Sequence, residues 1–412
     1  MMNYKITRNE KYDFKGQSYS SLYPNLHKYP ATMLPQIGIE ILRELNISSG
    51  KLLDPYCGSG SSFASGLECG LREMSGFDIN PLAVLISSVK FTKINLKKLI
   101  SEKNILRKNI YEFLKNEKNI FTLPPPHVTN IDFWFSKNVT EKLSILKFSI
   151  DKINNKQIRN FFLVPFSETV RECSYTRNNE FKLFRMKNED ILSFNPDVIS
   201  IFLKKLGETI SSYENYYLPN LKDDIKIDIQ YSKFEPVKDS FDVVLTSPPY
   251  GDSKTTVAYG QFSSLSNEWM GIDYARKIDG MLMGGTKYKT KIENGVISEP
   301  ICQIAKVDEK RSREVTSFYI DLEKSIKQVA DSIKKGGKTI YVVGNRTVKN
   351  IRLPTDQFIA EKFEENGFSH LVTYERALSN KTMPTKNSPT NKIGNTVGTM
   401  LMEYIVVCEK TQ

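Results

Sequence analysis

The feature that most constrains the fold is a strand, a glycine-rich turn and a helix in immediate succession near residue 50. The segment LLDPYCGSG, which ends at Gly60, has the pattern of a short buried strand entering a tight turn, and FASGLECGL behind it has helical apolar spacing. REMSGFDIN then predicts a second strand that ends at Asp78. A strand, a crossover helix and a second strand form the βαβ unit of a parallel sheet, so we expect an α/β protein.

The pattern divides the chain into three parts. We predict that residues 1–95 begin a sheet domain, that residues 96–220 form a mainly helical insertion, and that residues 221–412 complete the sheet domain. Strand patterns return with IKIDIQY and FDVVLT, then alternate with helices, and end in two strand-like runs. This order predicts a Rossmann-like, doubly wound, mostly parallel sheet with helices on both faces, a C-terminal antiparallel strand pair and a helical insertion.

Composition limits the classes of protein to consider. The 412 residues, 40% of them hydrophobic, are enough for a large core, and the net charge of +11 favours a polyanionic partner without deciding it. We find no apolar run of about 18 residues and no signal-peptide core, so we expect a cytoplasmic protein with no membrane contact. The five cysteines are scattered and the three histidines lie far apart, which predicts neither a disulfide framework nor a metal site.

The first ligand signal is the turn DPYCGSG itself. Its glycines let the backbone approach a ligand, and the helix behind it offers free N–H groups. It lacks the GK[ST] of a Walker loop and the complete GxGxxG pattern, so a tight structural turn explains it about as well. Asp78 is placed like the acidic residues that bind the ribose of adenosine-containing cofactors, although capping of the helix that starts at Pro81 is the alternative. Together the two features favour a nucleoside ligand without a bound phosphate.

The second signal is SPPY, which directly follows the strand FDVVLT. Two consecutive prolines stiffen a loop because neither can donate a backbone hydrogen bond. The exocyclic amine of a nucleobase is a poor nucleophile because its lone pair is delocalised into the ring. The Ser247 hydroxyl and the Pro248 carbonyl are acceptors for its N–H bonds, and Tyr250 offers a ring for stacking. A base reaches such a loop only by leaving the double helix, so we predict base flipping. A structural Pro-Pro turn explains the stiffness but not the four-residue combination.

The combination of DPYCGSG, FDIN and TSPPY resembles the amino-methyltransferases that methylate exocyclic amines of DNA bases. HKYPATMLPQ, residues 27–36, is similar to the segment before the glycine loop in some of them, and matching elements lie at residues 27–90 and 226–409. The resemblance implies S-adenosylmethionine as cofactor, double-stranded DNA as substrate and no metal. In a restriction-modification system a cognate restriction endonuclease would be a further partner.

The resemblance also implies roles for individual residues. The catalytic loop would comprise Ser247, Pro248, Pro249 and Tyr250. A serine at the first of these positions most often accompanies methylation of cytosine N4, whereas Asp or Asn accompanies adenine N6, so we expect cytosine N4. Lys381 and Pro384 resemble residues near the flipped base. The cofactor would contact Tyr29, Pro30, Ala31, Thr32, Asp54, Tyr56, Gly58, Gly60, Asp78 and Ile79.

The region that reads the DNA sequence is less defined, because the order of the motifs does not match the common permutation classes of the family. We favour the helical insertion, where Arg171 and Arg177 alternate with aromatic residues, although a solvated helix face is the more common explanation of such a pattern. The stretch 252–312 shows little periodicity and reads as irregular. Its first part, with Lys254, is predicted to contact nucleic acid or to form a lid.

Three other functions fit parts of the pattern. Methylation of adenine N6 uses the same architecture, and RNA guanine-N2 methyltransferases share a similar glycine loop and a Pro-Pro-Tyr loop. A nucleic-acid-binding module with a decayed cofactor pocket is the non-enzymatic alternative. It agrees less well with the sequence, because both the glycine loop and SPPY are intact.

Overall fold

The computed structural model describes residues 4–15, 23–30, 32–115, 123–177, 180–252, 257–378 and 401–412, and the backbone of 386–387 and 397–398. Its centre is an eight-stranded sheet with the strand order β1-β9-β12-β6-β5-β2-β3-β4. In that order the strands are Ile6–Arg8, Phe368–Ala377, Met402–Lys410, Ile333–Val343, Phe241–Thr246, Lys51–Asp54, Glu73–Asp78 and Lys226–Tyr231. Two short pairs lie outside it: β7 (Thr347–Val348) with β8 (Ile351–Arg352), and β10 (Lys386–Asn387) with β11 (Val397–Gly398).

The strand directions confirm the predicted fold class. Strands β4, β3, β2, β5 and β6 run parallel to one another, whereas β12 is antiparallel to both β6 and β9. The last strand in the sequence is therefore inserted between two earlier ones. The edge strand β1, which is parallel to β9, was not predicted. It has only three residues, all exposed, so it carries no burial pattern from which it could be recognised.

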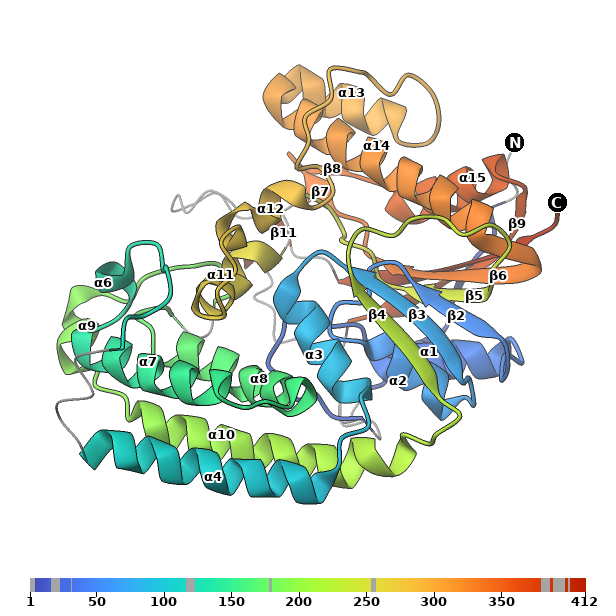
Figure 1. Ribbon diagram of the computed structural model, residues 1–412. Coiled ribbons are helices and arrows are strands. Elements are labelled where there is room, and N and C mark those ends of the chain that lie inside the picture. The colour runs from blue at the N-terminus through green and yellow to red at the C-terminus, as the bar shows by residue number, and fades with distance from the viewer. Residues whose placement is uncertain are drawn as a thin grey trace.

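The two faces of the sheet support two separate hydrophobic clusters. Neighbouring residues on one strand point to opposite faces. Thus Leu52 and Val243 belong to the cluster that includes α1 (Pro35–Glu44), α2 (Ser61–Glu68) and α3 (Pro81–Phe91). Leu53 and Val244 belong to the cluster that includes α14 (Glu309–Ser332) and α15 (Thr355–Glu365). Figure 1 shows these two helical layers on either side of the sheet.

Residues 96–220 form a group of helices beside the sheet, which we call the helical block (Figure 1). Its apolar side chains belong to the same cluster as α1, α2 and α3, so one continuous core joins the block to the sheet. The division of the chain into three domains stays a prediction. The block comprises α4 (Leu96–Lys115), α6 (Ile131–Trp134), α7 (Lys137–Asp151), α8 (Lys156–Glu172), α9 (Asn188–Ser193), α10 (Val198–Ser212), η2 (Tyr213–Tyr217) and η3 (Leu218–Asn220).

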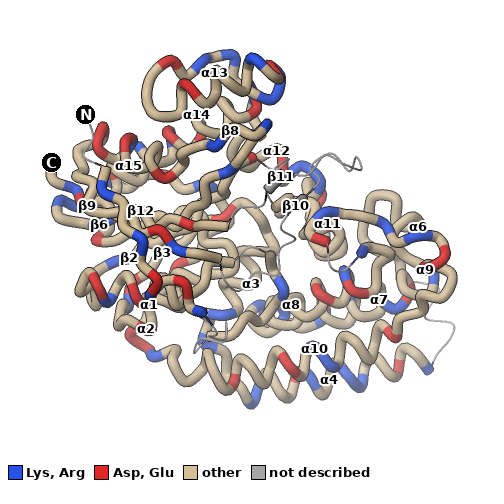
Figure 2. Tube along the Cα trace, turned by 180° about the vertical axis from the view of Figure 1, so that it is seen from behind, with Lys and Arg blue, Asp and Glu red and all other residues tan. Residues whose placement is uncertain are grey.

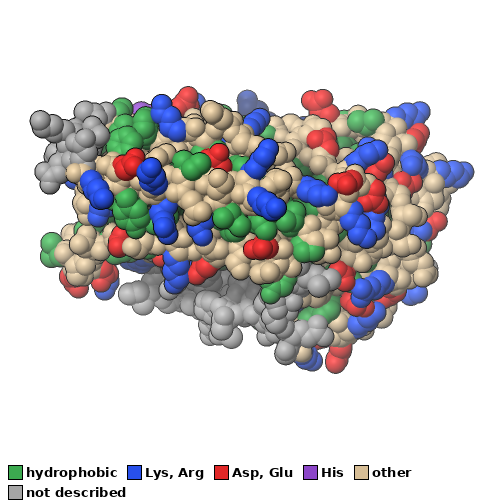
Figure 3. All heavy atoms as spheres, turned by 60° about the horizontal axis from the view of Figure 1, so that its bottom comes forward, with side chains coloured by type: hydrophobic (Ala, Val, Ile, Leu, Met, Phe, Trp, Pro, Cys, Tyr) green, Lys and Arg blue, Asp and Glu red, His purple; other side chains and the backbone are tan. Residues whose placement is uncertain are grey.

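The face of the block that contains α4 and α10 has a mixed surface. Figure 3 shows that Lys and Arg side chains alternate there with acidic and hydrophobic ones. Ile100 and Ile105 of α4 are 41% and 49% exposed. Because both signs of charge are mixed on it, we do not assign this face to DNA. Within the described residues, none of the helices combines the length and apolar character needed to cross a bilayer.

The prediction of an irregular stretch over 252–312 was wrong. It contains α11 (Tyr259–Trp269), η4 (Ala275–Lys277), α12 (Ile278–Met281) and α13 (Ser298–Val307). Helix α11 was missed because many of its buried residues are polar. Hydrogen bonds satisfy several of them inside the protein; Ser266, for example, donates to the Ser167 carbonyl (2.7 Å). The run FYIDLEKSIKQVADSIKKGG has a helical pattern that its two glycines would be expected to end, but α14 ends at Ser332 and both glycines belong to β6.

Candidate active site

Asp54, the last residue of β2, organises the glycine loop. One carboxylate oxygen accepts hydrogen bonds from the Tyr56 N–H (3.0 Å) and the Thr246 hydroxyl (2.6 Å), and the other accepts one from the Ser62 hydroxyl. Burial raises the pKa of Asp54 to about 6, although the three hydrogen bonds favour the ionised form. Because Thr246 directly precedes Ser247, Asp54 also fixes the glycine loop against the SPPY loop.

The two glycines of the loop have different tasks. Gly60 has a φ of +85°, and a Cβ there would lie 2.6 Å from the Phe91 ring, so packing alone requires glycine. Gly58 has a φ of +48°, and a Cβ there would meet no atom within 4 Å. The space beside the Gly58 backbone is therefore open, as a ligand that approaches the main chain requires.

Asp78 lies at the end of β3, beside the glycine loop. Its carboxylate accepts hydrogen bonds from the N–H groups of Gly58 (3.0 Å) and Asn80 (2.7 Å), and the residue stays partly exposed. Burial of the carboxylate raises the pKa of Asp78 to about 6, while these N–H groups lower it. A carboxylate held in this way at the edge of a parallel sheet can accept further hydrogen bonds from ligand hydroxyls.

Tyr29 joins this edge from the N-terminal segment. Its buried hydroxyl accepts a hydrogen bond from the Asn80 amide (3.0 Å), and its ring stacks on Tyr259 with 5.9 Å between the centroids. Tyr56 reaches across to α14, where its hydroxyl bonds to that of Ser325. Of the remaining predicted cofactor residues, Pro30 is buried, Thr32 and Ile79 are partly exposed, and Ala31 lies outside the described residues.

The SPPY loop follows β5 and leads into a chain of polar contacts. The Ser247 hydroxyl donates to the Tyr250 hydroxyl (3.3 Å), which donates to Glu403 of β12 (3.3 Å). Glu403 forms a buried ion pair with Arg376 of β9, whose Nε donates to the Tyr12 carbonyl (2.7 Å). Burial and the nearby Glu403 raise the pKa of Tyr250 well above its ordinary value, so the phenol keeps its proton. Pro248 is buried, and Pro249 is partly exposed.

The two loops share one edge of the sheet. Strands β2 and β5 are parallel neighbours, so their C-terminal ends, which carry the glycine loop and SPPY, lie side by side. Two residues near this edge were missed from the sequence. Asn80 follows FDI directly and caps α3, a signal that could have been used. Glu403 gives no local signal, because its partners come from distant segments.

The predicted nucleic-acid residues lie in different surroundings. Arg171 is buried: its guanidinium donates to the carbonyls of Phe262 (3.0 Å) and Glu180 and stacks 4.3 Å from the Phe262 ring centroid. Burial lowers the pKa of Arg171 to about 10. These contacts favour a structural role that holds α8 to α11. Arg177 is exposed, whereas Lys254, Lys381 and Pro384 lie outside the described residues.

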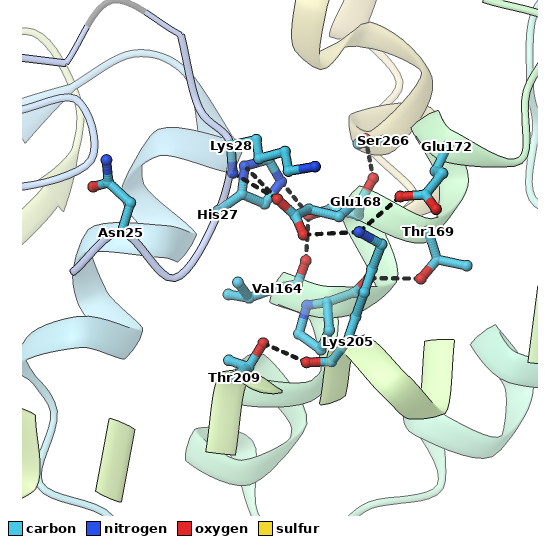
Figure 4. A network of polar contacts seen from close by, with 12 residues as sticks. Asn25, His27, Lys28, Val164, Glu168, Thr169, Glu172, Lys205, Thr209 and Ser266 are labelled. Atoms are coloured by element: carbon cyan, nitrogen blue, oxygen red, sulfur yellow. Dashed lines mark hydrogen bonds and ion pairs between the residues drawn. The ribbon is translucent and has the colours of Figure 1, made fainter. Parts of the chain in front are cut away.

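A polar network joins the segment before Tyr29 to the helical block (Figure 4). The Lys28 N–H donates to Glu168 (2.6 Å), and Lys205 of α10 bonds the same carboxylate (3.3 Å). His27 contacts the Ser167 hydroxyl through Nε2 (3.0 Å), and burial lowers the pKa of His27 to about 4, which keeps it neutral near pH 7. The segment that precedes Tyr29 is thus anchored on α8 and, through Glu168, on α10.

Metal-ligand clusters and reactive cysteines are two further sources of chemistry to consider among the described residues of this edge. In the part of the chain that the structure describes, no three His, Cys, Asp or Glu side chains are grouped so that they could hold a metal ion. Cys57 of the glycine loop is buried, and burial raises the pKa of its thiol well above the ordinary value, as expected of a small packing residue. That the reaction needs no metal stays a prediction.

Comparisons with known proteins identify the family. No family model matches the sequence. The Type II methyltransferase M.MvaI of Kocuria varians is 40% identical over 435 aligned positions, which cover 98% of this chain and 94% of that protein. The Type II methyltransferase M.MjaII of Methanocaldococcus jannaschii is 26% identical over 202 residues, or 48% of this chain and 35% of that protein. A solved structure from Thermus thermophilus, provisionally named a DNA modification methylase, has 21% identity and covers 27% of this chain and 42% of its own. Its TM-score of 0.18 is too low to support any argument. The near full-length relationship to M.MvaI shows that the chain belongs to the Type II DNA methyltransferases.

Proposed function

We propose that the protein transfers a methyl group from S-adenosylmethionine to the exocyclic N4 of a flipped cytosine in a short double-stranded DNA target. The observation that carries the proposal is the hydrogen bond between Asp54 and Thr246, because it holds the glycine loop and the SPPY loop against each other. Fixing two reactants next to each other can contribute a large part of the rate enhancement of a group transfer.

The glycine-loop side offers the groups that the cofactor needs. The open space at Gly58 would admit it to the backbone, and the Asp78 carboxylate would accept its ribose hydroxyls. Tyr29 and Ile79 would flank it, while Asp54 and Tyr56 would lie near its methionine part. When bound, the cofactor supplies an electrophilic methyl group on a sulfonium.

The SPPY loop supplies acceptors for the target amine. Since Ser247 donates its proton to Tyr250, and Tyr250 donates to Glu403, the lone pairs of the Ser247 oxygen stay available for an amine N–H. We propose the Pro248 carbonyl as the second acceptor and the Tyr250 ring as the stacking surface for the flipped base. Two acceptors on the N–H bonds localise the amine lone pair for attack, and the released proton passes to these acceptors or to water.

The choice of cytosine N4 depends on Ser247. In the methyltransferases that this chain resembles, serine at the first position of the motif most often accompanies N4 of cytosine. Adenine N6 uses the same architecture and is the second candidate.

The test is to incubate the protein and S-adenosylmethionine with unmethylated genomic DNA and, in parallel, with unmodified RNA. Both are then digested to nucleosides for mass spectrometry, with the Tyr250→Ala variant as control. We expect N4-methylcytosine in the DNA. N6-methyladenine would overturn the choice of base, and methylation confined to RNA would overturn the choice of polymer. Absence of S-adenosylmethionine binding by calorimetry would favour a non-enzymatic binding module.

A further inference from the structure

A surface hollow of about 220 Å³ lies where the helical block meets α11 and η4, apart from the two loops described above. Figures 1 and 2 both show α6 of the block beside α11. Trp269 at the end of α11 packs against Phe135 with 5.8 Å between the ring centroids, so the two parts are in contact below the hollow. Its lining consists of Thr129, Asn130, Phe133, Trp134 and Arg276.

Phe133 is an exposed aromatic ring that is held in place. Its ring meets Trp134 edge to face, with 4.8 Å between the centroids, and the Arg185 guanidinium lies 4.5 Å from its ring centroid. Arg185 also donates to the Phe133 carbonyl (2.9 Å). Even with these contacts Phe133 is 48% exposed. A fixed ring of this kind offers a stacking surface at little entropic cost.

Two of the polar side chains that line the hollow, Arg276 and Thr129, are also held in place. Arg276 makes two hydrogen bonds to Glu268 (2.8 and 3.0 Å), and the Thr129 hydroxyl donates to the same carboxylate (2.7 Å). Asn130 has a φ of +53°, and its side chain does not cap α6. Its amide can donate and accept at once, which is the pattern that the edge of a nucleobase requires.

The hollow is too far from the cofactor side to hold the base that reacts. Helix α11 connects the two, from Tyr259, which stacks on Tyr29, to Trp269. At about 1.5 Å per residue it is about 16 Å long. Since base pairs stack about 3.4 Å apart, this length corresponds to roughly five base-pair steps. A short target sequence is long enough to reach both places.

We propose that this hollow binds a second, unstacked nucleobase of the target DNA, distinct from the base that is methylated. The base stacks on Phe133 and turns its edge towards Asn130. The inference rests on the proposed function and deepens it, because it places one step of target recognition at the junction of α6 and α11. A bare phosphate would leave the aromatic surface unused, whereas a nucleobase uses both the ring and the amide.

The direct test is photocrosslinking on duplexes that contain the mapped methylation target, with 5-iodouracil placed at one position at a time. Mass spectrometry of the digested protein then identifies the attached residue. We expect a base other than the methylated one to crosslink to Phe133 or Trp134. The proposal would be overturned if bases of the target crosslinked to other residues of the protein but none crosslinked to Phe133 or Trp134. Once the target has been mapped, the crosslinking step itself needs no methyl transfer, so its outcome is read separately from the rate of the proposed reaction.

The functional test compares Phe133→Ala with Phe181→Ala, which removes an equally exposed ring outside the hollow. We expect methyl transfer at low DNA concentration to fall roughly 5- to 100-fold for Phe133→Ala only, with unchanged S-adenosylmethionine binding and melting temperature. An abasic site at the crosslinked position should abolish this difference from wild type, since the stacked base is then absent.

A second variant tests the amide of Asn130. Asn130→Gly keeps the positive φ while removing the amide, and we expect it to relax the base preference at the crosslinked position. Equal losses from Phe133→Ala and Phe181→Ala, or a Phe133→Ala defect that persists on the abasic duplex, would overturn the proposal. Failure of the proposed function would look different, because wild-type protein would then methylate no DNA.

Discussion

The glycine loop and the SPPY loop end neighbouring strands at the same edge of the sheet, but they are held in different ways. On the glycine side, Asp54 and Asp78 accept short hydrogen bonds, such as the 2.6 Å bond from Thr246 to Asp54 and the 2.7 Å bond from Asn80 to Asp78. On the SPPY side, both contacts of Tyr250 are 3.3 Å long, beyond the usual length of about 2.8 Å for O–H···O bonds. The proposed cofactor side is therefore formed in advance, whereas the proposed substrate side would exchange its partners for those of a base.

The largest effect should come from the substrate side. We expect Tyr250→Ala to lower the single-turnover rate of methyl transfer on the order of 100-fold, because the base loses its stacking surface. Affinity for S-adenosylmethionine, measured by calorimetry, should stay the same, and Tyr250→Phe should retain most of the rate. If Tyr250→Ala weakened cofactor binding as much as turnover, the two loops would not have the separate tasks that we assign to them.

The reverse pattern should follow from Asp78→Ala on the cofactor side. Loss of the charged acceptor should weaken S-adenosylmethionine binding roughly 10- to 50-fold and leave DNA binding unchanged. Leu192→Ala, at a residue of α9 that is 90% exposed, serves as the control. An unchanged cofactor affinity would remove Asp78 from the site.

The pH dependence of S-adenosylmethionine affinity should distinguish the two loops further. The pKa of Asp78 is raised by burial to about 6, so its carboxylate is mostly protonated at pH 5 and ionised at pH 7. S-adenosylmethionine affinity should therefore rise about tenfold between these values, with a midpoint near 6, and Asp78→Asn should flatten the profile.

The stability of the fold should fall with rising pH, whereas the affinity for S-adenosylmethionine should rise. The pKa values of Asp54 and Asp78 in the folded protein lie above the unfolded value of about 3.9, so the folded state binds more protons between pH 4 and 6. Their contribution to stability is then lost as the pH rises through this range. Melting temperatures of wild type and Asp78→Asn between pH 4 and 7 provide the check, and identical profiles would contradict the assignment.

The smallest effect should come from Glu403, which acts through Tyr250. We expect Glu403→Gln to lower the methyl-transfer rate roughly 3- to 10-fold with unchanged cofactor affinity, because the orientation of Ser247 and Tyr250 is lost. Glu375→Gln, which alters a carboxylate bonded to Tyr404 instead, is the matched control. Rescue by Glu403→Asp would show a positioning role. A rate that simply follows a lower melting temperature would indicate a structural role alone.

Features that depend on local sequence could be predicted. The strands that end at Asp54, Asp78 and Thr246 are short segments with buried apolar residues, each followed by turn residues, and the structure has them at those places. The fold class followed from their alternation with helices and is confirmed. Both loops were found from local sequence, because glycine permits backbone conformations that other residues avoid, whereas proline restricts the backbone.

Features that depend on distant partners could not be predicted. Nothing near Glu403 indicates that it pairs with Arg376 and faces Tyr250, since these contacts arise only when β12 enters the sheet. Helix α11 was misread because buried serines look like solvent-exposed ones in a sequence. The positions proposed for the cofactor and the target base remain predictions, because they concern molecules that bind to this edge.

The position of β12 has a consequence for the synthesis of the enzyme. Ribosomes make this strand after every other strand of the sheet, yet it lies between β6 and β9. Before it emerges, β9 and β1 have no strand that connects them to β6, and Tyr250 has no Glu403 behind it. A nascent chain that stops before Met402 therefore carries both loops but not the Glu403 carboxylate that supports the second one, so the two loops are made well before their surroundings are.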